Sequence, residues 1–425
     1  MLLLTVAAIG AWNAYDYPSF RGFDAAEHVA YAEALIHHGE IPGPEQRSEY
    51  YTPPGFYALA GIAIVLGEQV HPADPAKFAQ YMNWAVLMAT GAVLLLLVRE
   101  LFPTRRRLQL GALGYFCLLP VVLRSAAMFH PEPLSMLLST LALLLAARLF
   151  TRRAFRALPA VALGVILGAG QLVRAFSLWT FAAVIVAFGA ALLFEQADRR
   201  ALARTLLITT AVCAVVVSPW YIRQAIHYGN PVFAVEAEHT PIWERRPESF
   251  YLGLGMPQVF TDPIRPNYVN EALPTTYSDL WGDYFGVFGW DSSAHLINSR
   301  QTHELQQQSY LGVLPTLLAL AGWIALLVVA IRRRWAAVLP VALLPGLGIL
   351  GYLYFTVSYP TSDGDVLKAS YMLTTAPAWA VAFGAAFEWL GARGRFVRAA
   401  LLVVLVVSAF LSVPYLVYGQ PLGFL

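Results

Sequence analysis

The chain has 425 residues, of which 58% are hydrophobic and 13% are charged; its formal net charge is +2 and its mean hydropathy is +0.58. A soluble globular protein would carry roughly 25% charged residues, so this composition excludes an ordinary soluble enzyme. The apolar residues form blocks long enough to cross roughly 30 Å of hydrocarbon. The composition therefore predicts an all-α polytopic membrane protein.

Twelve apolar blocks are candidate membrane spans, so we expect a bundle of about 11–12 transmembrane helices. The first block has no basic region and no clear cleavage site, which favours a membrane helix over a removed signal peptide. The blocks cover residues 1–14, 54–67, 80–98, 108–127, 133–150, 157–175, 178–194, 205–220, 310–331, 335–356, 371–390 and 397–417.

Short arginine runs between the blocks predict the topology, because short loops rich in Lys and Arg stay in the cytoplasm. With every run inside, the loops at 15–53, 128–132, 221–309 and 357–370 lie outside the cytoplasmic membrane. Two blocks, 54–67 and 80–98, separate an outer 15–53 from an inner 99–107, but only an odd number of crossings can join them. Either 54–67 does not fully cross or the 99–107 loop breaks the positive-inside rule, and we favour 54–67 as a short or partial span. The runs are topology signals, and no nucleic-acid partner is expected.

We divide the chain into three parts. Residues 1–220 form a transmembrane module whose first outer loop, 15–53, carries the candidate chemistry. Residues 221–309 form an extracytoplasmic loop rich in aromatic and acidic residues, and residues 310–425 form the last transmembrane helices. Both long outer loops are acidic, and 221–309 is too long for a plain connector.

The first outer loop gathers titratable side chains at helical spacing. Asp24, Glu27, His28 and Tyr31 would share one face of a helix. A solvated amphipathic helix on the membrane surface explains the spacing equally well. A carboxylate beside apolar surroundings could instead accept a proton from a hydroxyl nucleophile, which makes Asp24 and Glu27 candidate catalytic bases.

The short connection at 128–132 places His130 and Glu132 between two apolar blocks. Ionisable residues at a membrane boundary are costly unless they have partners, so they are candidates to line the active site. An interfacial turn is the structural alternative.

Basic residues near the predicted outer ends of spans form a third group. They differ from the arginine runs, which all lie in predicted cytoplasmic loops. Guanidinium and ammonium groups pair well with phosphate, so these residues are candidate ligands of an anionic lipid headgroup. Snorkelling or a local ion pair is the alternative, which for Lys368 would involve Asp363 or Asp365. The group consists of Arg124, Arg174, Arg223 and Lys368.

Aromatic residues crowd the segments 218–233 and 281–290. They are typical of an interfacial belt, and a sugar-stacking surface is the functional alternative. A metal site built from Asp24, Glu27, His28 and His130 would suit Mn²⁺ or Mg²⁺, but none of the spacings is diagnostic and no metal ligand is assigned.

Taken in order, these clusters resemble the membrane glycosyltransferases of the GT-C superfamily, in the branch of the bacterial protein O-mannosyltransferases and aminoarabinose transferases (family 39-like). Each matching motif is short, and together they cover most of the chain. They are Asp24-x-x-Glu27-His28-x-x-Tyr31, Tyr51-x-Pro53-Pro54-x-x-Tyr57, Pro219-Trp220-x-x-Arg223 with Gly229-Asn230-Pro231, and Gly364-Asp365 with Lys368-x-x-Tyr371.

The resemblance implies an inverting enzyme that moves a sugar from a polyprenyl-phosphate donor to a hydroxyl or amine of a glycan, lipid or protein acceptor, outside the cytoplasmic membrane. A carboxylate of the first outer loop then serves as the base, either Asp24 or Glu27. Basic side chains would then bind the phosphate of the donor, and other polar side chains would line the part of the site that holds the acceptor. The candidates are Arg174, Arg223 and Lys368 for the phosphate, and His28, Tyr31, His130 and Glu132 for the lining.

Two other functions stay open. A transporter or flippase of lipid-linked sugars would need ionisable residues in mid-span, whereas the apolar blocks here are nearly free of central charges. A protein like an O-antigen polymerase or ligase would share the large outer loop and the arginines, but not the acidic first loop.

Overall fold

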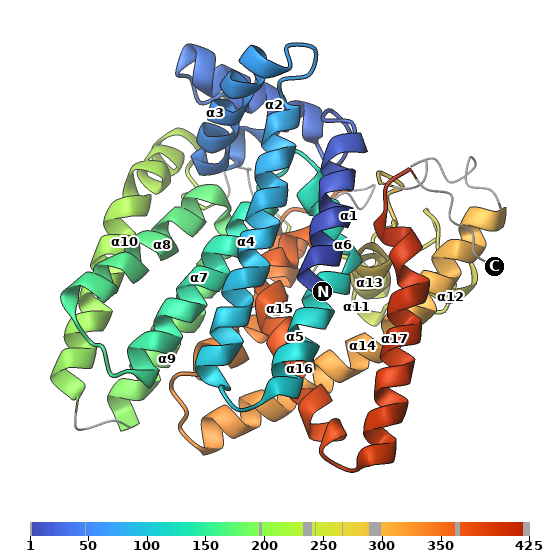
Figure 1. Ribbon diagram of the computed structural model, residues 1–425. Helices are drawn as coiled ribbons and strands as arrows, with labels where there is room; N and C mark the ends of the chain where they lie inside the picture. Colours follow the sequence, from blue (N-terminus) through green and yellow to red (C-terminus); the bar gives the residue numbers. More distant parts are fainter. Residues whose placement is uncertain are drawn as a thin grey trace.

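The computed structural model describes residues 2–46, 48–194, 198–232, 240–242, 244–265, 267–288, 299–361 and 366–419, and within these ranges it is helical with no strand (Figure 1). The chain is therefore an all-α polytopic membrane protein, as predicted. Its helices are α1 (Leu2–Asp16), α2 (Ala25–Glu33), η1 (Ala34–His38), η2 (Ser48–Tyr51), α3 (Gly55–Val70), α4 (Lys77–Leu101), α5 (Arg106–Leu118), α6 (Pro120–Ala127), α7 (Glu132–Thr151), α8 (Ala157–Val173), η3 (Ala175–Ser177), α9 (Leu178–Phe194), α10 (Arg199–Tyr228), α11 (Glu248–Leu252), α12 (Gln258–Thr261), α13 (Ala272–Trp281), α14 (Ser299–Arg332), α15 (Leu339–Ser358), η5 (Ala369–Thr375), α16 (Ala376–Gly391) and α17 (Arg395–Leu416).

Every predicted span coincides with helix, but fewer helices than predicted meet the length and composition of a full crossing. Among the described residues there are seven, or eight if one bent pair counts as a single span. Two further apolar helices, α3 and α8, are shorter. The seven are α4, α7, η3 with α9, α10, α14, α15 and the Arg395–Val413 part of α17.

The predicted span 108–127 is broken. Helices α5 and α6 meet at an angle of 51° around Leu119 and Pro120. Proline has no backbone N–H to continue the helical ladder, and it drives the preceding residue out of the helical region. Leu119 accordingly has the extended dihedrals φ −76° and ψ 111°. The break turns α6 under the first loop.

Helix α3 stays at the end of the bundle that carries the first loop. It begins directly after that loop. Asp74, in the turn that follows the C-terminal end of α3, accepts a 2.7 Å hydrogen bond from the hydroxyl of Ser19 in the first loop, so both ends of α3 lie close to this loop. Figure 1 shows α2 and α3 together at the top of the molecule. This position and the short length of α3 agree with the interpretation of 54–67 as a short or partial span.

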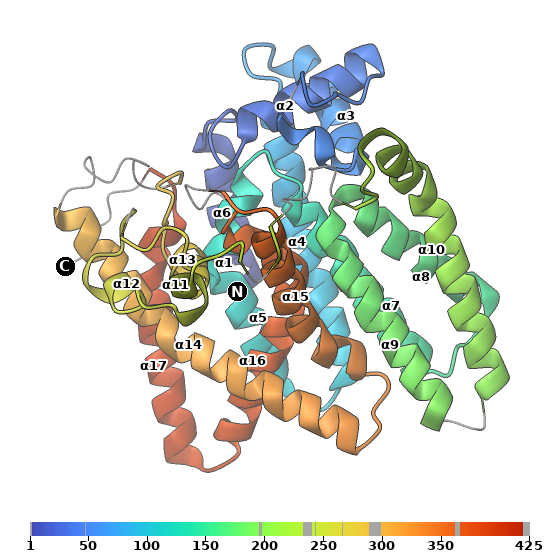
Figure 2. The same cartoon turned by 180° about the vertical axis from the view of Figure 1, so that it is seen from behind.

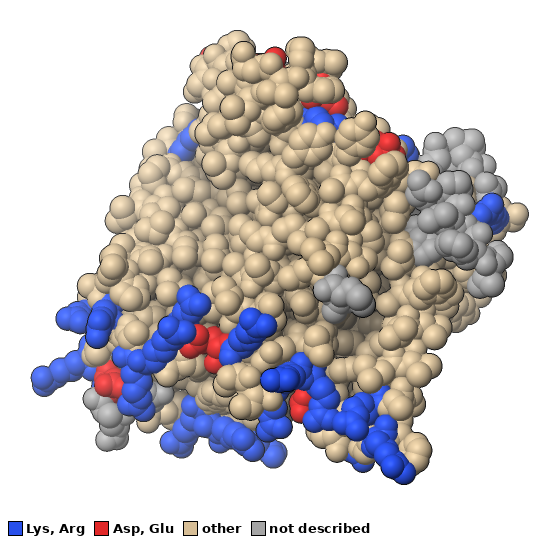
Figure 3. Space-filling view, viewed as in Figure 1, with Lys and Arg blue, Asp and Glu red and all other residues tan. Residues whose placement is uncertain are grey.

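The arginine runs lie together at the opposite end, which we call the arginine end; the end with α2 and α3 is the loop end. Ion pairs connect the runs, with Arg107 3.0 Å from Glu388 and Arg153 2.9 Å from Asp198. Figure 3 shows Lys and Arg gathered along this edge, far from the acidic residues at the top. This segregation agrees with the predicted topology.

The connection between α10 and α14 is shorter than the predicted loop 221–309, because α10 continues to Tyr228 and α14 begins at Ser299. Its described parts contain the short helices α11, α12 and α13, which lie beside α6 and α14 (Figure 2).

The long helices approach one another where residues are small. Gly322 of α14 packs so closely against the Ala382 carbonyl of α16 that a Cβ at this position would overlap it.

Candidate active site

An ion pair at the loop end joins two distant parts of the chain. Lys368 Nζ lies 2.8 Å from Asp24 Oδ2. Asp24 immediately precedes α2 and has a positive φ of 51°, a conformation that Asp tolerates better than most residues. Lys368 immediately precedes η5. The lysine side chain is 2% exposed and the aspartate 36%, so the carboxylate is the open side of the pair.

The surroundings of Asp24 keep its carboxylate ionised. Burial would raise its pKa, but the ammonium of Lys368 outweighs burial, and His28 and His130 act in the same direction. The pKa of Asp24 falls to about 2. An unpaired carboxyl in this position would be a considerably stronger base.

Glu27, the other candidate base, lies one helical turn further along α2. Its side chain is half-buried and forms no ion pair or hydrogen bond within the described part of the chain. Of the two candidate bases, the structure therefore brings only Asp24 into contact with a predicted phosphate ligand.

Aromatic rings enclose the ammonium of Lys368. Its Nζ lies 5.2 Å from the ring centre of Phe23 and 5.8 Å from that of Tyr371. The ring of Tyr371 also lies 5.2 Å from the guanidinium of Arg174, so two cations flank it. Phe285, from the connection after α13, packs edge-on against Phe23 at 5.4 Å.

A buried polar network supports the pair from within the bundle. Arg174 Nε donates a 2.7 Å hydrogen bond to Glu132, and its Nη1 donates one of 3.2 Å to Thr52. Thr52 in turn donates to Glu49 at 2.8 Å, while Glu132 contacts His130. His130 and Glu132 are both buried, so in this structure they brace Arg174 instead of lining an open surface.

His28 and Tyr31 extend the network into α2 and α3. His28 is hydrogen-bonded to the Tyr57 hydroxyl at 2.7 Å and meets the His130 ring edge-on at 5.0 Å. Burial lowers the pKa of His28 to about 4, against the effect of Glu49. Tyr31 stacks on Tyr57 at 3.8 Å.

Arg223 lies apart from the Asp24–Lys368 pair. Its guanidinium is 3.5 Å from the carbonyl of Ile41 and 5.6 Å from the ring of Trp220. Its predicted contact with donor phosphate stays a prediction. The motif residues Gly364 and Asp365, together with Asp363, lie outside the described residues.

The sequence analysis did not identify the residue that anchors Lys368. Asp279 of α13 is fully buried, and its Oδ2 accepts a 2.7 Å hydrogen bond from the backbone N–H of Ala369. Its Oδ1 lies 3.6 Å from Arg124 of α6, which also approaches Asp283 at 3.8 Å. Burial raises the pKa of Asp279, and Arg124 opposes that effect. Asp279 lies among the aromatic residues of 277–285, and no local motif indicated this role.

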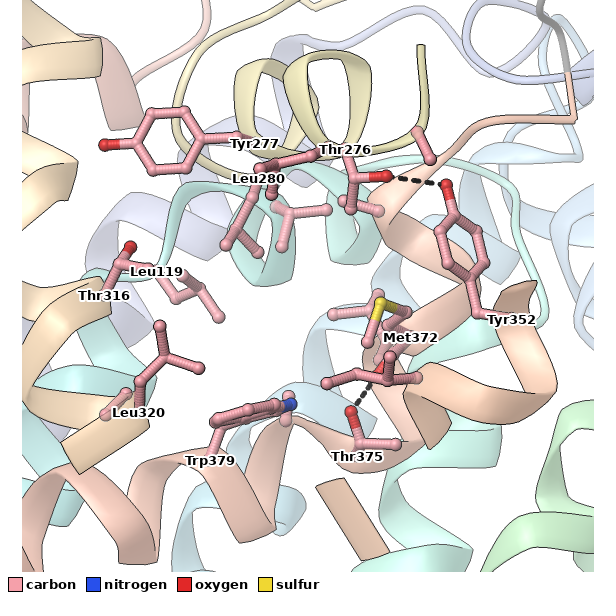
Figure 4. A pocket seen from close by; sticks show the side chains of 18 of the residues that line it. Leu119, Thr276, Tyr277, Leu280, Thr316, Leu320, Tyr352, Met372, Thr375 and Trp379 are labelled. Carbon is pink, nitrogen blue, oxygen red and sulfur yellow. Dashed lines mark hydrogen bonds between the residues drawn. The ribbon is translucent and has the colours of Figure 1, made fainter. Parts of the chain in front are cut away.

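An apolar cavity of about 410 Å³ adjoins the Lys368 end of the pair. Ala369, Met372 and Leu373 of η5 form part of its wall, and the rest comes from α5, α6, α11, α13, α14, α15 and α16. Figure 4 shows Leu119, Leu280, Leu320 and Trp379 around the space, with a hydrogen bond of 2.8 Å between Thr276 and Tyr352 at its edge. The walls are almost entirely apolar.

Three of the four predicted donors of a divalent cation contact other side chains of the described residues, whereas Glu27 forms no ion pair or hydrogen bond there. Asp24 is held by Lys368, His28 by Tyr57 and His130 by Glu132. Within the described residues, no group of three or more His, Cys, Asp or Glu could hold a metal ion.

Comparison with solved structures assigns the fold. The apo crystal structure of the Archaeoglobus fulgidus oligosaccharyltransferase matches 99% of this chain with a TM-score of 0.56 at 15% identity. The chain has the GT-C fold. AglB from Archaeoglobus fulgidus, in complex with an inhibitory peptide and a dolichol-phosphate, gives 0.54 at 15% identity and the same coverage. A weaker match, with a TM-score of 0.42 at 16% identity, is ArnT from Cupriavidus metallidurans, over 91% of this chain and 76% of that one.

This GT-C chain spans little more than half of the archaeal enzyme, 56% of its length in both structures. No protein-family model matches the sequence, and no curated protein matches it.

Proposed function

We propose that the protein is an inverting glycosyltransferase that moves a sugar from a polyprenyl-phosphate donor to an acceptor hydroxyl or amine. The acceptor is a glycan, lipid or protein, and the site faces outward from the cytoplasmic membrane. The observation that carries the proposal is the Asp24–Lys368 pair: a candidate base and a candidate phosphate ligand in direct contact, between an apolar cavity and the loop end.

In the proposed reaction, the acceptor oxygen attacks the anomeric carbon of the donor sugar. A new carbon–oxygen bond forms as the bond from that carbon to the phosphate oxygen breaks, and the bonding electrons leave with the phosphate. The acceptor proton passes to a carboxylate oxygen of Asp24. An amine acceptor would react in the same way through its nitrogen. Attack opposite to the leaving group inverts the anomeric centre.

The main electrostatic demand is the charge that develops on the departing phosphate, which fixed cations in a water-poor site stabilise strongly. Lys368 is the nearest candidate, since it is buried and adjoins the cavity. Arg174 is a second, on the other side of the Tyr371 ring. Its bonds to Glu132 and Thr52 hold the guanidinium in a fixed position.

The cavity supports a lipid-linked donor. A phosphate bound at Lys368 would place an attached hydrocarbon chain beside apolar walls formed by η5, α13, α14 and α15. A hydrocarbon chain can move from the bilayer into such a cavity without displacing water from polar groups, because the walls are as apolar as lipid tails. A donor without a lipid would leave these walls uncovered.

The distribution of buried charge favours an enzyme over a flippase. A flippase needs polar groups along a path through the bilayer. Among the described residues, the buried charged side chains Glu49, Glu132, Arg174 and Lys368 belong to the network around Asp24, and Arg124, Asp279 and Asp283 form a second group connected to it through Ala369. With the arginine end in the cytoplasm, the loop end and its site face outward.

The test measures binding of undecaprenyl phosphate to the purified full-length protein in detergent. We expect saturable binding that Lys368→Met abolishes while the variant keeps its thermal unfolding temperature. Tyr81→Phe, a substitution on α4 away from the pair, is the control and should bind as the parent does. Equal binding by the parent and Lys368→Met would remove the phosphate assignment.

A further inference from the structure

We propose that Asp24 and the donor phosphate compete for the ammonium of Lys368, so that donor binding frees Asp24 to serve as the base. This inference rests on the proposed function and adds an order to it: donor first, acceptor second. Lys368 would then both stabilise the leaving group and keep the base paired until a donor arrives.

Position supports an exchange of partners. The side chain of Lys368 contacts Asp24, and the next residue along the chain, Ala369, forms part of the cavity wall, so the pair and the cavity are neighbours in the fold. Its backbone is held by the bond from Ala369 to Asp279, so the motion needed is confined to the flexible four-carbon side chain. An ammonium is a compact charge that can turn between acceptors, unlike the planar fork of an arginine.

Charge supports the exchange as well. Lys368 is the one group within the described residues that forms an ion pair with Asp24. The other titratable groups that face Asp24 are His28 of α2, His130, Tyr51 and Tyr371. Two anions sharing one buried ammonium would leave a net negative charge away from water, which is costly. The phosphate therefore replaces the carboxylate as the partner of Lys368.

The exchange changes the chemistry of Asp24. Without the ammonium, burial raises its pKa, and the carboxylate becomes a stronger base. Its oxygens are then available to an acceptor hydroxyl. Because the carboxylate is the more exposed member of the pair, an acceptor can reach it from the loop end while the cavity holds the donor.

A double-mutant cycle on undecaprenyl phosphate binding tests the competition. Asp24→Asn removes the competing anion, so we expect the variant to bind undecaprenyl phosphate roughly tenfold more tightly than the parent, although it loses transfer. The same substitution in a Lys368→Met background should then change the affinity by less than twofold. Thermal unfolding of all four proteins checks that each is folded.

Two results would overturn the exchange while leaving the proposed function intact. One is unchanged or weaker binding by Asp24→Asn. The other is a tenfold gain that persists without Lys368, which would indicate general repulsion between Asp24 and the phosphate. If the parent protein itself does not bind undecaprenyl phosphate, the proposed function fails, and the exchange fails with it.

The sequence offers a second readout that does not depend on stable variants. The chain has only two lysines, Lys77 and Lys368, so lysine labelled with ¹³C at Cε gives two signals. Undecaprenyl phosphate should shift the Lys368 signal and leave that of Lys77, which donates to the Tyr17 carbonyl, in place. Two unshifted signals at saturating lipid would contradict the exchange.

Discussion

Asp279 accepts a hydrogen bond from the backbone of Ala369, the residue that follows Lys368, across 90 positions of the sequence. The Asp279 side chain of α13 thereby holds the first residue of η5 in place. Arg124 of α6 is the counter-charge of Asp279. The position of Lys368 is thus set by residues outside the four short motifs that carry the resemblance.

Removing the charge of Asp279 should loosen Lys368. We expect Asp279→Asn to raise the KM for donor roughly tenfold with a smaller change in kcat, because the amide accepts a weaker hydrogen bond and leaves Arg124 with less counter-charge. Asp279→Glu, which keeps the charge, should recover part of the loss. If KM is unchanged and the apparent kcat falls only in proportion to the folded fraction, Asp279 is structural and does not position Lys368.

The two candidate bases can be separated by matched substitutions. Asp24→Asn should lower the rate of transfer by roughly 10²- to 10⁴-fold, the usual contribution of a positioned base. Glu27→Gln, one turn away on α2, should stay within about threefold of the parent, because its side chain has no partner in the described site. Initial rates with a fixed donor measure both. The reverse pattern would assign the base to Glu27.

Filling the cavity should weaken donor binding without touching the charged groups. Ala319 of α14 lines the cavity and is buried, so Ala319→Trp should raise the Kd for undecaprenyl phosphate roughly tenfold or more by occupying its space. Leu317→Trp, on the same helix but exposed, is the matched control. Equal affinities for the two variants would place the lipid elsewhere.

Acid should destabilise the loop end through His28. The pKa of His28 is about 4 in the folded chain and 6.5 in the unfolded one, so its contribution is complete above pH 6.5 and is lost as the pH falls towards 4. The full effect is up to about 3 kcal/mol. His28→Gln should flatten the fall in unfolding temperature between these values, whereas His37→Gln, in an exposed ion pair, should not. Identical profiles for the parent and His28→Gln would contradict this.

The helices could be read from the sequence because each apolar block carries its own signal. Asp24, His28, His130, Glu132, Arg174 and Lys368 were identified because charges beside apolar blocks need partners. Which partner each one has could not be predicted: the contact of Lys368 with Asp24, 344 positions away, has no local signal, and the alternative partners Asp363 and Asp365 lie outside the described residues. Such pairings depend on how the helices pack, and a local sequence pattern does not predict them.

Two other differences have local physical causes. The break before Pro120 followed from a single residue within an apolar block that otherwise predicts one span. Arg223 was grouped with the candidate phosphate ligands as a basic residue near a predicted outer span end; α10 packs mainly against α8 and carries it towards Ile41, and its contact with phosphate stays a prediction.

The most direct test of the account is transfer itself. Purified protein is supplied with polyprenyl-phosphate monosaccharides and a membrane extract as the source of acceptor, and the release of free polyprenyl phosphate is measured. The account predicts release from at least one donor, lost in Asp24→Asn and Lys368→Met and kept in Glu27→Gln. Release by Asp24→Asn at the rate of the parent protein would contradict it.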